Sequence, residues 1–381
     1  MGTALIFSFK KFVDNPAGLT LILSLPWIIS IVNGPICSFL SDRVWTRFGR
    51  RKPFVVASAI GTIPCLFLMP LMPSLWGLIA VYMVHGLFGD LGGPLEPLKQ
   101  EIIPPRQRGG ATAAMVWCSN LANITFYFVA LGRFDDVTFM AGFPLSGERA
   151  IYWTSCLMGI VILLLVAFGI KEVNQHSALR GERFSIRNFL RGITSSEIWP
   201  VYVLISGAAM LTSGLGPLGN LLYTDQWGYS KQDMGVNIAI GGVINIFLIG
   251  MLGLVATRLD RVKAYKTLLY IILCLNTGYY CYIKLVLADH RPSLVEMVLF
   301  GEMVTVALIL ANVLYVPMVY DFIRRNQMGT YAAGSGIVAR LTGVLTVNGL
   351  GLFVWIYAVL FLAPAATGRE CIYGTRMGKI T

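Results

Sequence analysis

The chain is dominated by apolar runs of about 20 to 30 residues that follow one another along most of its length. A transmembrane helix needs about 20 consecutive apolar residues to cross the hydrocarbon core of a bilayer. Only 13% of the 381 residues are charged, about half the share that is typical of soluble domains, so the sequence predicts an all-α integral membrane protein. We predict membrane-spanning helices near residues 16–40, 54–72, 75–97, 110–131, 150–170, 199–222, 234–257, 265–287, 293–320 and 330–362.

Positive charge is concentrated in alternate connections between the predicted spans. The formal net charge of +11 would suggest a nucleic-acid partner in a soluble protein. However, 19 of the 30 Lys and Arg residues fall in five alternate connections, at 43–52, 99–108, 171–191, 258–266 and 324–325. This positive-inside pattern places the five connections in the cytoplasm. The charge is therefore a signal of membrane topology, and we expect no nucleic-acid partner.

Sequence motifs of catalysis, nucleotide hydrolysis and metal binding are absent. The sequence contains no P-loop, no G-x-S-x-G and no H-E-x-x-H segment, which argues against ATP-driven transport and hydrolytic chemistry. Its seven cysteines lie mostly inside apolar runs without C-x-x-C spacing, as expected of small packing residues. We therefore expect neither an enzyme nor a bound cofactor or metal.

The largest polar interruption, 171–197, divides the apolar runs into two blocks. The segment from Pro97 to Glu101 matches the segment from Pro317 to Asp321 at an offset of 220 residues, although chance recurrence of Pro and acids at helix ends would look the same. Duplicated helical bundles are typical of secondary transporters. We predict an N-terminal bundle, a cytoplasmic linker and a C-terminal bundle at 1–170, 171–198 and 199–381.

The most specific segment connects the first two predicted spans, from Gly34 to Phe54 (GPICSFLSDRVWTRFGRRKPF). Asp42 ends one helix, where its carboxylate can accept hydrogen bonds or pair with an Arg. Gly49 permits a tight turn, and the basic residues 50–52 hold the loop at the cytoplasmic face. Such a latch can form and break as two helical bundles rock against each other.

The Ser-Asp-Arg triplet and the following Arg-Phe-Gly-Arg-Arg-Lys-Pro-Phe resemble the loop signature of the major facilitator superfamily. This motif is most similar to that of the sugar-cation symporter branch, which includes the sucrose and glycoside-pentoside-hexuronide carriers. The resemblance implies a two-bundle helical transporter with about 10 to 11 spans of a usual 12. The family's first helix would be reduced to the run before Lys10, and its twelfth would be absent or folded into the run after Gly349. We expect the inner gate to be latched by Asp42, Arg43, Arg50, Arg51, Glu101 and Asp321.

Ionisable residues inside the predicted spans are few, and each is a candidate for the transport pathway because a charge in the bilayer is costly. Asp90 could bind a driving proton or Na⁺, or form an internal salt bridge or gate contact. His85 could relay a proton or pack between helices. Glu302 and Arg340 fall at similar depths on consecutive spans, so we expect them to pair. That pair would be either a switchable contact with the solute or a permanent structural feature.

Polar and aromatic side chains in the predicted span 110–131 are candidates for binding a solute. Asn120 and Asn123 are three residues apart and share a helix face, so their amides could hydrogen-bond either solute hydroxyls or a neighbouring helix. Trp117 could stack on a sugar ring or anchor helix packing.

These residues lead to one hypothesis and two alternatives. We expect a monomeric plasma-membrane transporter that moves a sugar by proton- or Na⁺-coupled alternating access, with the sugar identity implied by the resemblance alone. An organic-anion or drug carrier of the same superfamily is one alternative, because Arg340 suits an anion as well as a sugar. A non-transporting receptor or scaffold is the other, because the end helices that the resemblance implies are missing.

Overall fold

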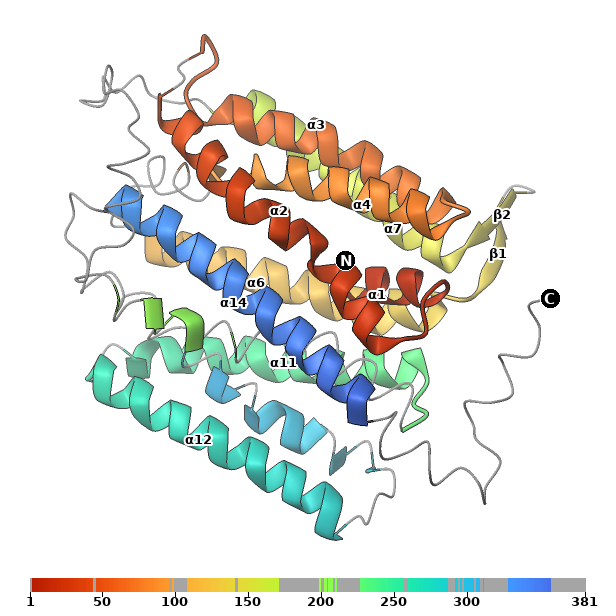
Figure 1. Ribbon diagram of the computed structural model, residues 1–381, viewed down its shortest axis with the longest axis vertical. Helices are drawn as coiled ribbons and strands as arrows, with labels where there is room; N and C mark the ends of the chain where they lie inside the picture. The colour runs from red at the N-terminus through yellow and green to blue at the C-terminus, as the bar shows by residue number, and fades with distance from the viewer. Residues whose placement is uncertain are drawn as a thin grey trace.

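The computed structural model describes residues 2–43, 46–95, 98, 108–140, 143–170, 227–256, 260–286 and 328–357, and shorter stretches between 199 and 210 and between 292 and 311. These residues form long helices that run alongside one another, with one short hairpin at the edge (Figure 1). The predicted linker 171–198 lies outside the described residues, as do most of the predicted spans 199–222 and 293–320.

The N-terminal helices follow the predicted spans closely. In chain order they are α1 (Gly2–Lys10), α2 (Pro16–Arg43), α3 (Lys52–Leu68) with the 3-10 turn η1 (Met69–Leu71), α4 (Leu75–Asp90), α6 (Arg108–Thr125) and α7 (Gly147–Leu164). The π-turn η2 (Phe126–Ala130) extends α6 and is followed by the 3-10 turn η3 (Leu131–Arg133). The π-turn η4 (Leu165–Gly169) extends α7. An antiparallel hairpin of β1 (Val137–Met140) and β2 (Phe143–Ser146) leads into α7.

The C-terminal part contains α11 (Lys231–Ala256), α12 (Arg261–Cys281) with the π-turn η6 (Tyr282–Val286), and α14 (Met328–Tyr357). The last predicted span, 330–362, is longer than the roughly 20 residues that a bilayer requires. The structure describes one continuous helix of 30 residues as far as Tyr357. At 1.5 Å per residue, such a helix is about 45 Å long and exceeds the thickness of the hydrocarbon core.

Helix ends follow from the local sequence. Ser74 and Ser146 accept hydrogen bonds from backbone N–H groups in the first turns of α4 and α7, and Asp260 does the same for α12. Gly49 has a φ of 117°, a conformation that a residue with a side chain rarely adopts, and it closes the turn 46–49 between α2 and α3. The predicted role of Gly49 in this turn is confirmed.

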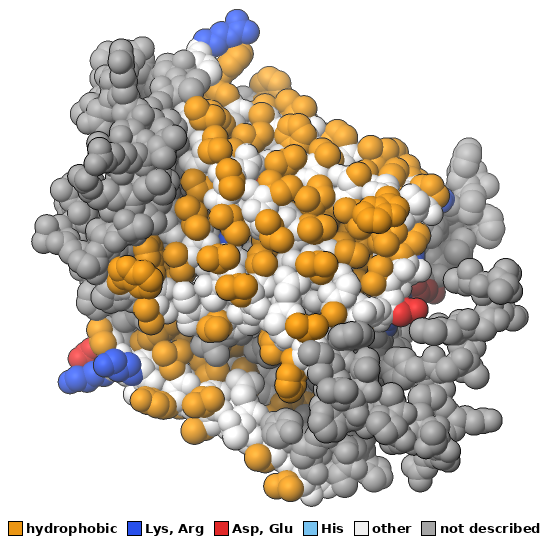
Figure 2. Space-filling view, viewed as in Figure 1, with side chains coloured by type: hydrophobic (Ala, Val, Ile, Leu, Met, Phe, Trp, Pro, Cys, Tyr) orange, Lys and Arg blue, Asp and Glu red, His pale blue; other side chains and the backbone are white. Residues whose placement is uncertain are grey.

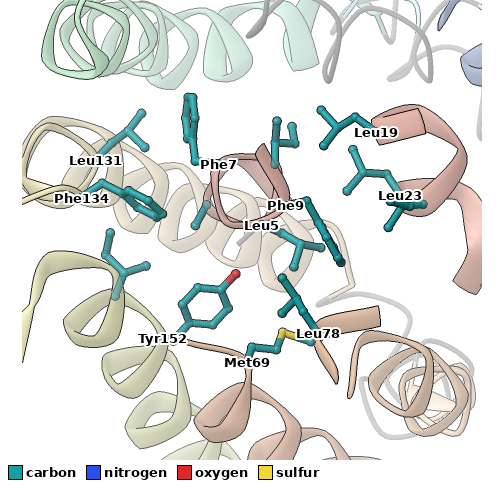
Figure 3. Packing of buried hydrophobic residues seen from close by; sticks show 14 of the residues in the cluster. Leu5, Phe7, Phe9, Leu19, Leu23, Met69, Leu78, Leu131, Phe134 and Tyr152 are labelled. Atoms are coloured by element: carbon teal, nitrogen blue, oxygen red, sulfur yellow. The ribbon is translucent and has the colours of Figure 1, made fainter. Parts of the chain in front are cut away.

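The best-packed region surrounds the short helix α1. Phe7 and Phe9 are at most 3% exposed, and Tyr152 of α7 is fully buried beside them. Figure 3 shows α1 end-on, with its side chains directed towards several neighbouring helices. The cluster also contains Leu5, Leu19, Leu23, Met69, Leu78, Leu131 and Phe134. The apolar run before Lys10, which is too short to span a bilayer, is therefore a core helix.

A polar network ties α1 to the start of α7. The Ser8 hydroxyl donates a hydrogen bond to Glu148 at 2.7 Å and lies 3.0 Å from the Tyr152 hydroxyl. Lys11 forms an ion pair with the other Glu148 oxygen. Glu148 is only 8% exposed, and these contacts supply the partners that a buried carboxylate requires.

Large apolar side chains cover much of the molecular surface. Figure 2 shows a face that is mostly hydrophobic where it is described, with charged side chains near its margins. Phe168, Trp76 and Leu165 are 81%, 78% and 65% exposed, which suits contact with lipid. Among the described helices, four stretches are long and apolar enough to cross a membrane: Pro16–Cys37, Lys52–Leu71, Gly147–Gly169 and Gly336–Phe353.

Helix α2 occupies the centre of the arrangement in Figure 1, between helices from the two ends of the chain. It packs against α4 on one side and against α14 on the other. Helix α3 packs against α4 and α7, and α11 packs against α6 and its extension η2–η3. The α2–α14 and α6–α11 contacts therefore join N-terminal helices to C-terminal helices.

Candidate functional site

Helices α2 and α4 lie side by side and run in the same direction. The Tyr82 hydroxyl donates to the carbonyl of Leu23 at 3.0 Å, and further along both helices the Asn33 amide donates to the carbonyl of Leu87 at 3.0 Å. These contacts bring Asp90, the last residue of α4, against the middle of α2.

The Asp90 carboxylate is surrounded by hydrogen-bond donors from two other helices. The Ser30 hydroxyl lies 2.6 Å from both carboxylate oxygens, and the Asn33 amide donates at 3.1 Å. Nη2 of Arg340, on α14, donates to Oδ1 at 3.1 Å. The Asp90 side chain is 7% exposed and that of Arg340 is 33% exposed. An ion pair at this depth is much less screened by water than a surface pair.

Arg340 reaches Asp90 because α2 carries a glycine, Gly34, where α14 packs against it. A Cβ on Gly34 would lie only 2.0 Å from Nη1 of Arg340, so a side chain at this position would occupy the space of the guanidinium. The same Nη1 donates to the backbone carbonyl of Ser30. The guanidinium is thus held by a carboxylate on α4 and by a carbonyl on α2.

Two further contacts define the seam between α2 and α14. The Asn348 amide donates to the Ser24 hydroxyl at 2.9 Å, and a Cβ on Gly351 would lie 2.2 Å from Oγ1 of Thr20. Residue numbers fall along α14 as they rise along α2, so the helices are antiparallel. Small and hydroxyl-bearing residues at such a seam let helix backbones approach closely in a membrane.

The predicted pair of Glu302 and Arg340 is wrong. Arg340 bonds to Asp90 and Ser30, whereas Glu302 lies against α11, where a Cβ on Gly241 would fall 1.7 Å from its Oε1. The similar depth of Glu302 and Arg340 in the membrane says nothing about their positions around the helix bundle. That lateral position is set by the packing of α14 on α2.

The other predicted binding residues do not join the Asp90 cluster. His85 lies five residues before Asp90, which is more than one helical turn, and is half-buried on a different face of α4. Asn120 is half-buried on α6, while Asn123 and Trp117 are exposed, Trp117 at 54%. Within the described part of the chain, no hydrogen bond connects any of these four residues to Asp90 or Arg340.

The predicted gate residues are only partly described. The backbone of Asp42 and Arg43 forms the end of α2, but their side chains lie outside the described part of the structure. Glu101 and Asp321 lie outside it entirely. Arg50 belongs to the turn after α2, and Arg51, which is 8% exposed, stands immediately before α3. The predicted latch at the inner gate stays a prediction.

A neighbouring lysine anchors the same loop. Lys52 donates to the carbonyl of Ile170, just beyond the end of η4, at 2.8 Å. The C-terminal end of a helical segment leaves carbonyl groups without partners, and a cation there is favourable. The loop is therefore fixed to the end of the α7–η4 segment.

Sequence reasoning missed the neutral residues that complete the cluster, Ser30, Asn33 and Gly34. Their spacing of three and four residues places them on one face of α2, which is the signal that was available. A lone serine or asparagine in a span is unremarkable, and only the arrival of Asp90 and Arg340 at this face distinguishes them.

The fold and the buried ion pair define a class of protein: a multi-pass helical membrane transporter built around a charged contact between its N-terminal and C-terminal helices. A model of the Major Facilitator Superfamily matches residues 2–347, and the chain belongs to this family. The predicted fold class is confirmed, and this is a family of transporters and not of enzymes.

Individual relatives agree with this assignment. The MFS-type transporter oryN of Aspergillus oryzae is 28% identical over 181 residues, which are 47% of this chain. The match covers 33% of that relative's length. The xylose transporter XylE of E. coli, in a partially occluded inward-open conformation, has a similar fold with a TM-score of 0.59 at 15% identity. That alignment covers 95% of this chain and 94% of the other.

A bacterial homologue of the iron transporter ferroportin, in an outward-facing state, is also similar in fold. Its TM-score is 0.57 at 14% identity, and the alignment covers 94% of this chain and 90% of that one. The names of these two proteins refer to solutes as different as xylose and iron, so the fold alone does not identify a solute.

Proposed function

We propose that this transporter moves a small solute, a sugar, by coupling its passage to a proton or Na⁺ bound at Asp90. The observation that carries the proposal is the buried Asp90–Arg340 ion pair, which joins α4 to α14. Ionisable groups inside a membrane protein are costly and are typical of ion and substrate pathways. Because the pair joins an N-terminal helix to a C-terminal helix, a change in its charge also changes the contact between these two helices.

The proposed coupling follows from what a proton or cation does to this contact. A proton on Asp90 removes the negative charge that holds the guanidinium, and a bound Na⁺ competes for the same carboxylate oxygens. Of the described contacts, Arg340 then keeps the one with the Ser30 carbonyl, and it becomes available to solute hydroxyls. One charge moving through about 100 mV supplies about 2.3 kcal/mol, which is enough to concentrate a solute roughly fiftyfold.

The sugar assignment is supported by the loop between α2 and α3, which resembles that of the sugar-cation symporter branch. The xylose transporter named above has the same fold, and we extend its solute class to this chain only as part of the proposal. An organic anion is the second candidate, favoured by the guanidinium of Arg340, which is 33% exposed and pairs well with carboxylates. We place the protein in the plasma membrane and expect it to act as a monomer.

Uptake by proteoliposomes tests the proposal. The 381-residue chain, Asp90→Asn and the control Asp233→Asn would be reconstituted, and a panel of labelled monosaccharides, disaccharides and organic anions would be offered with an inward proton or Na⁺ gradient. Asp233 is an acid at the start of α11, remote from the cluster. We expect one gradient to drive sugar accumulation, and we expect Asp90→Asn to lose accumulation while keeping exchange.

Each other outcome has a definite meaning. Accumulation that survives Asp90→Asn would remove Asp90 from the coupling site. Gradient-driven uptake of anions without uptake of sugars would replace the sugar assignment with the second candidate. Loss of accumulation in Asp233→Asn as well would show that the effect is not specific to the ion pair.

A further inference from the structure

A second polar feature inside the C-terminal helices is separate from the Asp90 cluster. A cavity of about 480 Å³ lies between α11, α12 and the helical residues 298–308, which are light blue in Figure 1. This volume falls in the range of sites for small organic molecules. None of the lining residues belongs to α2, α4 or α14.

The lining is apolar except for one carboxylate. Nine of the ten lining residues are hydrophobic, among them Ile244 of α11, Leu268 of α12, and Leu299 and Met303. The tenth is Glu302. A cavity of this composition is complementary to an apolar body through van der Waals contacts, and its one acidic group selects for the charge of that body.

Among the residues that the structure describes, Glu302 has no counter-ion. Its Oε2 is buried and has no hydrogen-bond partner among the described residues, and its Oε1 is pressed against the backbone of α11 at Gly241. Arg340, the expected partner, is engaged by Asp90 on other helices. None of the described residues that line the cavity is a Lys, Arg or His. A carboxylate in this position is stabilised by a cation that enters the cavity from outside the chain.

The lining decides which kind of cation fits. Metal ions such as Ca²⁺ and Mg²⁺ need several oxygen ligands, and the described residues contain no group of three His, Cys, Asp or Glu suited to a metal. An ammonium group on an apolar body matches both the carboxylate and the nine hydrophobic residues. Leu299, Met303 and Ile271 are 59%, 53% and 43% exposed on a surface that faces lipid in a membrane, so such a molecule can enter from the bilayer.

We propose that this cavity binds a lipophilic monocation, a protonated amine with an aromatic or hydrocarbon body, with Glu302 as its counter-ion. The flexible thioether of Met303 lets the wall adapt to bodies of different shape. The proposal does not rest on sugar transport, because it concerns binding at residues that the Asp90 cluster does not use.

Equilibrium dialysis with two matched probes tests the proposal. Labelled 2-(1-naphthyl)ethylamine and its uncharged analogue 2-(1-naphthyl)ethanol would be offered to the full chain in lipid nanodiscs, with empty nanodiscs subtracted for partitioning. The variants are Glu302→Gln, which removes the charge at constant size, Glu302→Asp, which keeps it, and Met303→Trp, which fills the cavity. Glu296→Gln is the matched control, because Glu296 lies on the same segment but is engaged by Tyr282 and Ser293.

We expect saturable binding of the amine that weakens about tenfold or more in Glu302→Gln and Met303→Trp, and that persists in Glu302→Asp and Glu296→Gln. The alcohol should bind to the wild-type chain more weakly than the amine does. Its affinity for Glu302→Gln should equal its affinity for the wild-type chain. Amine binding that is unchanged in Glu302→Gln, or an alcohol that binds as tightly as the amine, would overturn the proposal. Absence of saturable amine binding to the wild-type chain would also overturn it. Because no gradient or transport is involved, these outcomes are independent of the uptake experiment.

Discussion

Replacing Gly34 with alanine is the sharpest test of the Asp90–Arg340 contact, because it changes neither charged residue. The new Cβ would lie 2.0 Å from Nη1 of Arg340, whereas ordinary van der Waals contact begins at 3.4 Å. The guanidinium must therefore retreat by about 1.4 Å. A retreat of this size that leads away from Asp90 would take Nη2 out of hydrogen-bonding range of Asp90, from which it is now 3.1 Å away.

Two opposing effects decide the sign of the change. Alanine inside a helix is favoured over glycine by about 0.5–1 kcal/mol. Losing a hydrogen bond to a charged group costs about 1.5–3 kcal/mol. Nη1 of Arg340, which faces Gly34, also loses its bond to the Ser30 carbonyl. We expect Gly34→Ala to lower the free energy of unfolding by about 1–3 kcal/mol. The partial exposure of Arg340, which lets water replace part of the loss, keeps the figure in this range.

The assay is equilibrium unfolding in mixed micelles, followed by helical circular dichroism. Gly89→Ala is the matched control, because it lies beside Asp90 on α4 and a Cβ there would meet nothing within 4 Å. This control should be neutral or slightly stabilising. The loss in Gly34→Ala should largely disappear in an Arg340→Ala background, since the new methyl group then has no guanidinium to displace. Wild-type stability of Gly34→Ala, or a loss that is undiminished in that background, would refute the reasoning.

Three further predictions can be checked by the same unfolding titration. Gly147→Ala should lower the free energy of unfolding by about 2–3 kcal/mol, because its Cβ would lie 1.6 Å from the backbone carbonyl oxygen of Arg133, which cannot rotate away; stability equal to wild type would contradict this close approach. Lys231→Gln should cost about 1–2 kcal/mol through the loss of its Asp135 ion pair and its contacts with two aromatic rings, and Lys231→Arg should recover most of that. Tyr152→Phe should cost about 0.5–1.5 kcal/mol, the worth of one neutral hydrogen bond, and a larger loss would mean that the hydroxyl also organises its neighbours.

The helices themselves were largely predictable, because a bilayer imposes a length on every apolar run. The predicted span 16–40 became α2 (Pro16–Arg43) and the predicted span 234–257 became α11 (Lys231–Ala256). The exception is the end of α6, where the chain continues through a π-turn and a 3-10 turn into a hairpin. Hydropathy responds to composition and is insensitive to such changes in helical pitch.

The charged residues of the candidate site could be picked out from the sequence, but neither their pairing nor the neutral residues around them could. Counting residues from a membrane surface gives the depth of a side chain, and by depth Glu302 and Arg340 looked like partners. Which way a helix face points depends on its neighbours, and those are set by close approaches at residues such as Gly34 and Gly351. Asp90 was one of the residues singled out, and an internal salt bridge was one of its open alternatives; its partner could be found only once α14 was placed on α2.

The seam between α2 and α14 combines two kinds of contact that act differently when helices move. Gly34 and Gly351 bring the backbones close, and such small-residue surfaces let helices pack tightly without polar contacts. Helix α14 is held at two levels, eight residues or about 12 Å apart along it: Arg340 contacts Asp90 of α4 and the Ser30 carbonyl of α2, and Asn348 contacts Ser24 of α2. Only the first of these contacts carries charge, so only it responds directly to a proton or a cation. A change of charge at Asp90 would therefore loosen α14 from α4, while the contacts of Arg340 with the Ser30 carbonyl and of Asn348 with Ser24 still hold α14 to α2. This favours rotation of α14 on α2 over separation of the two helices.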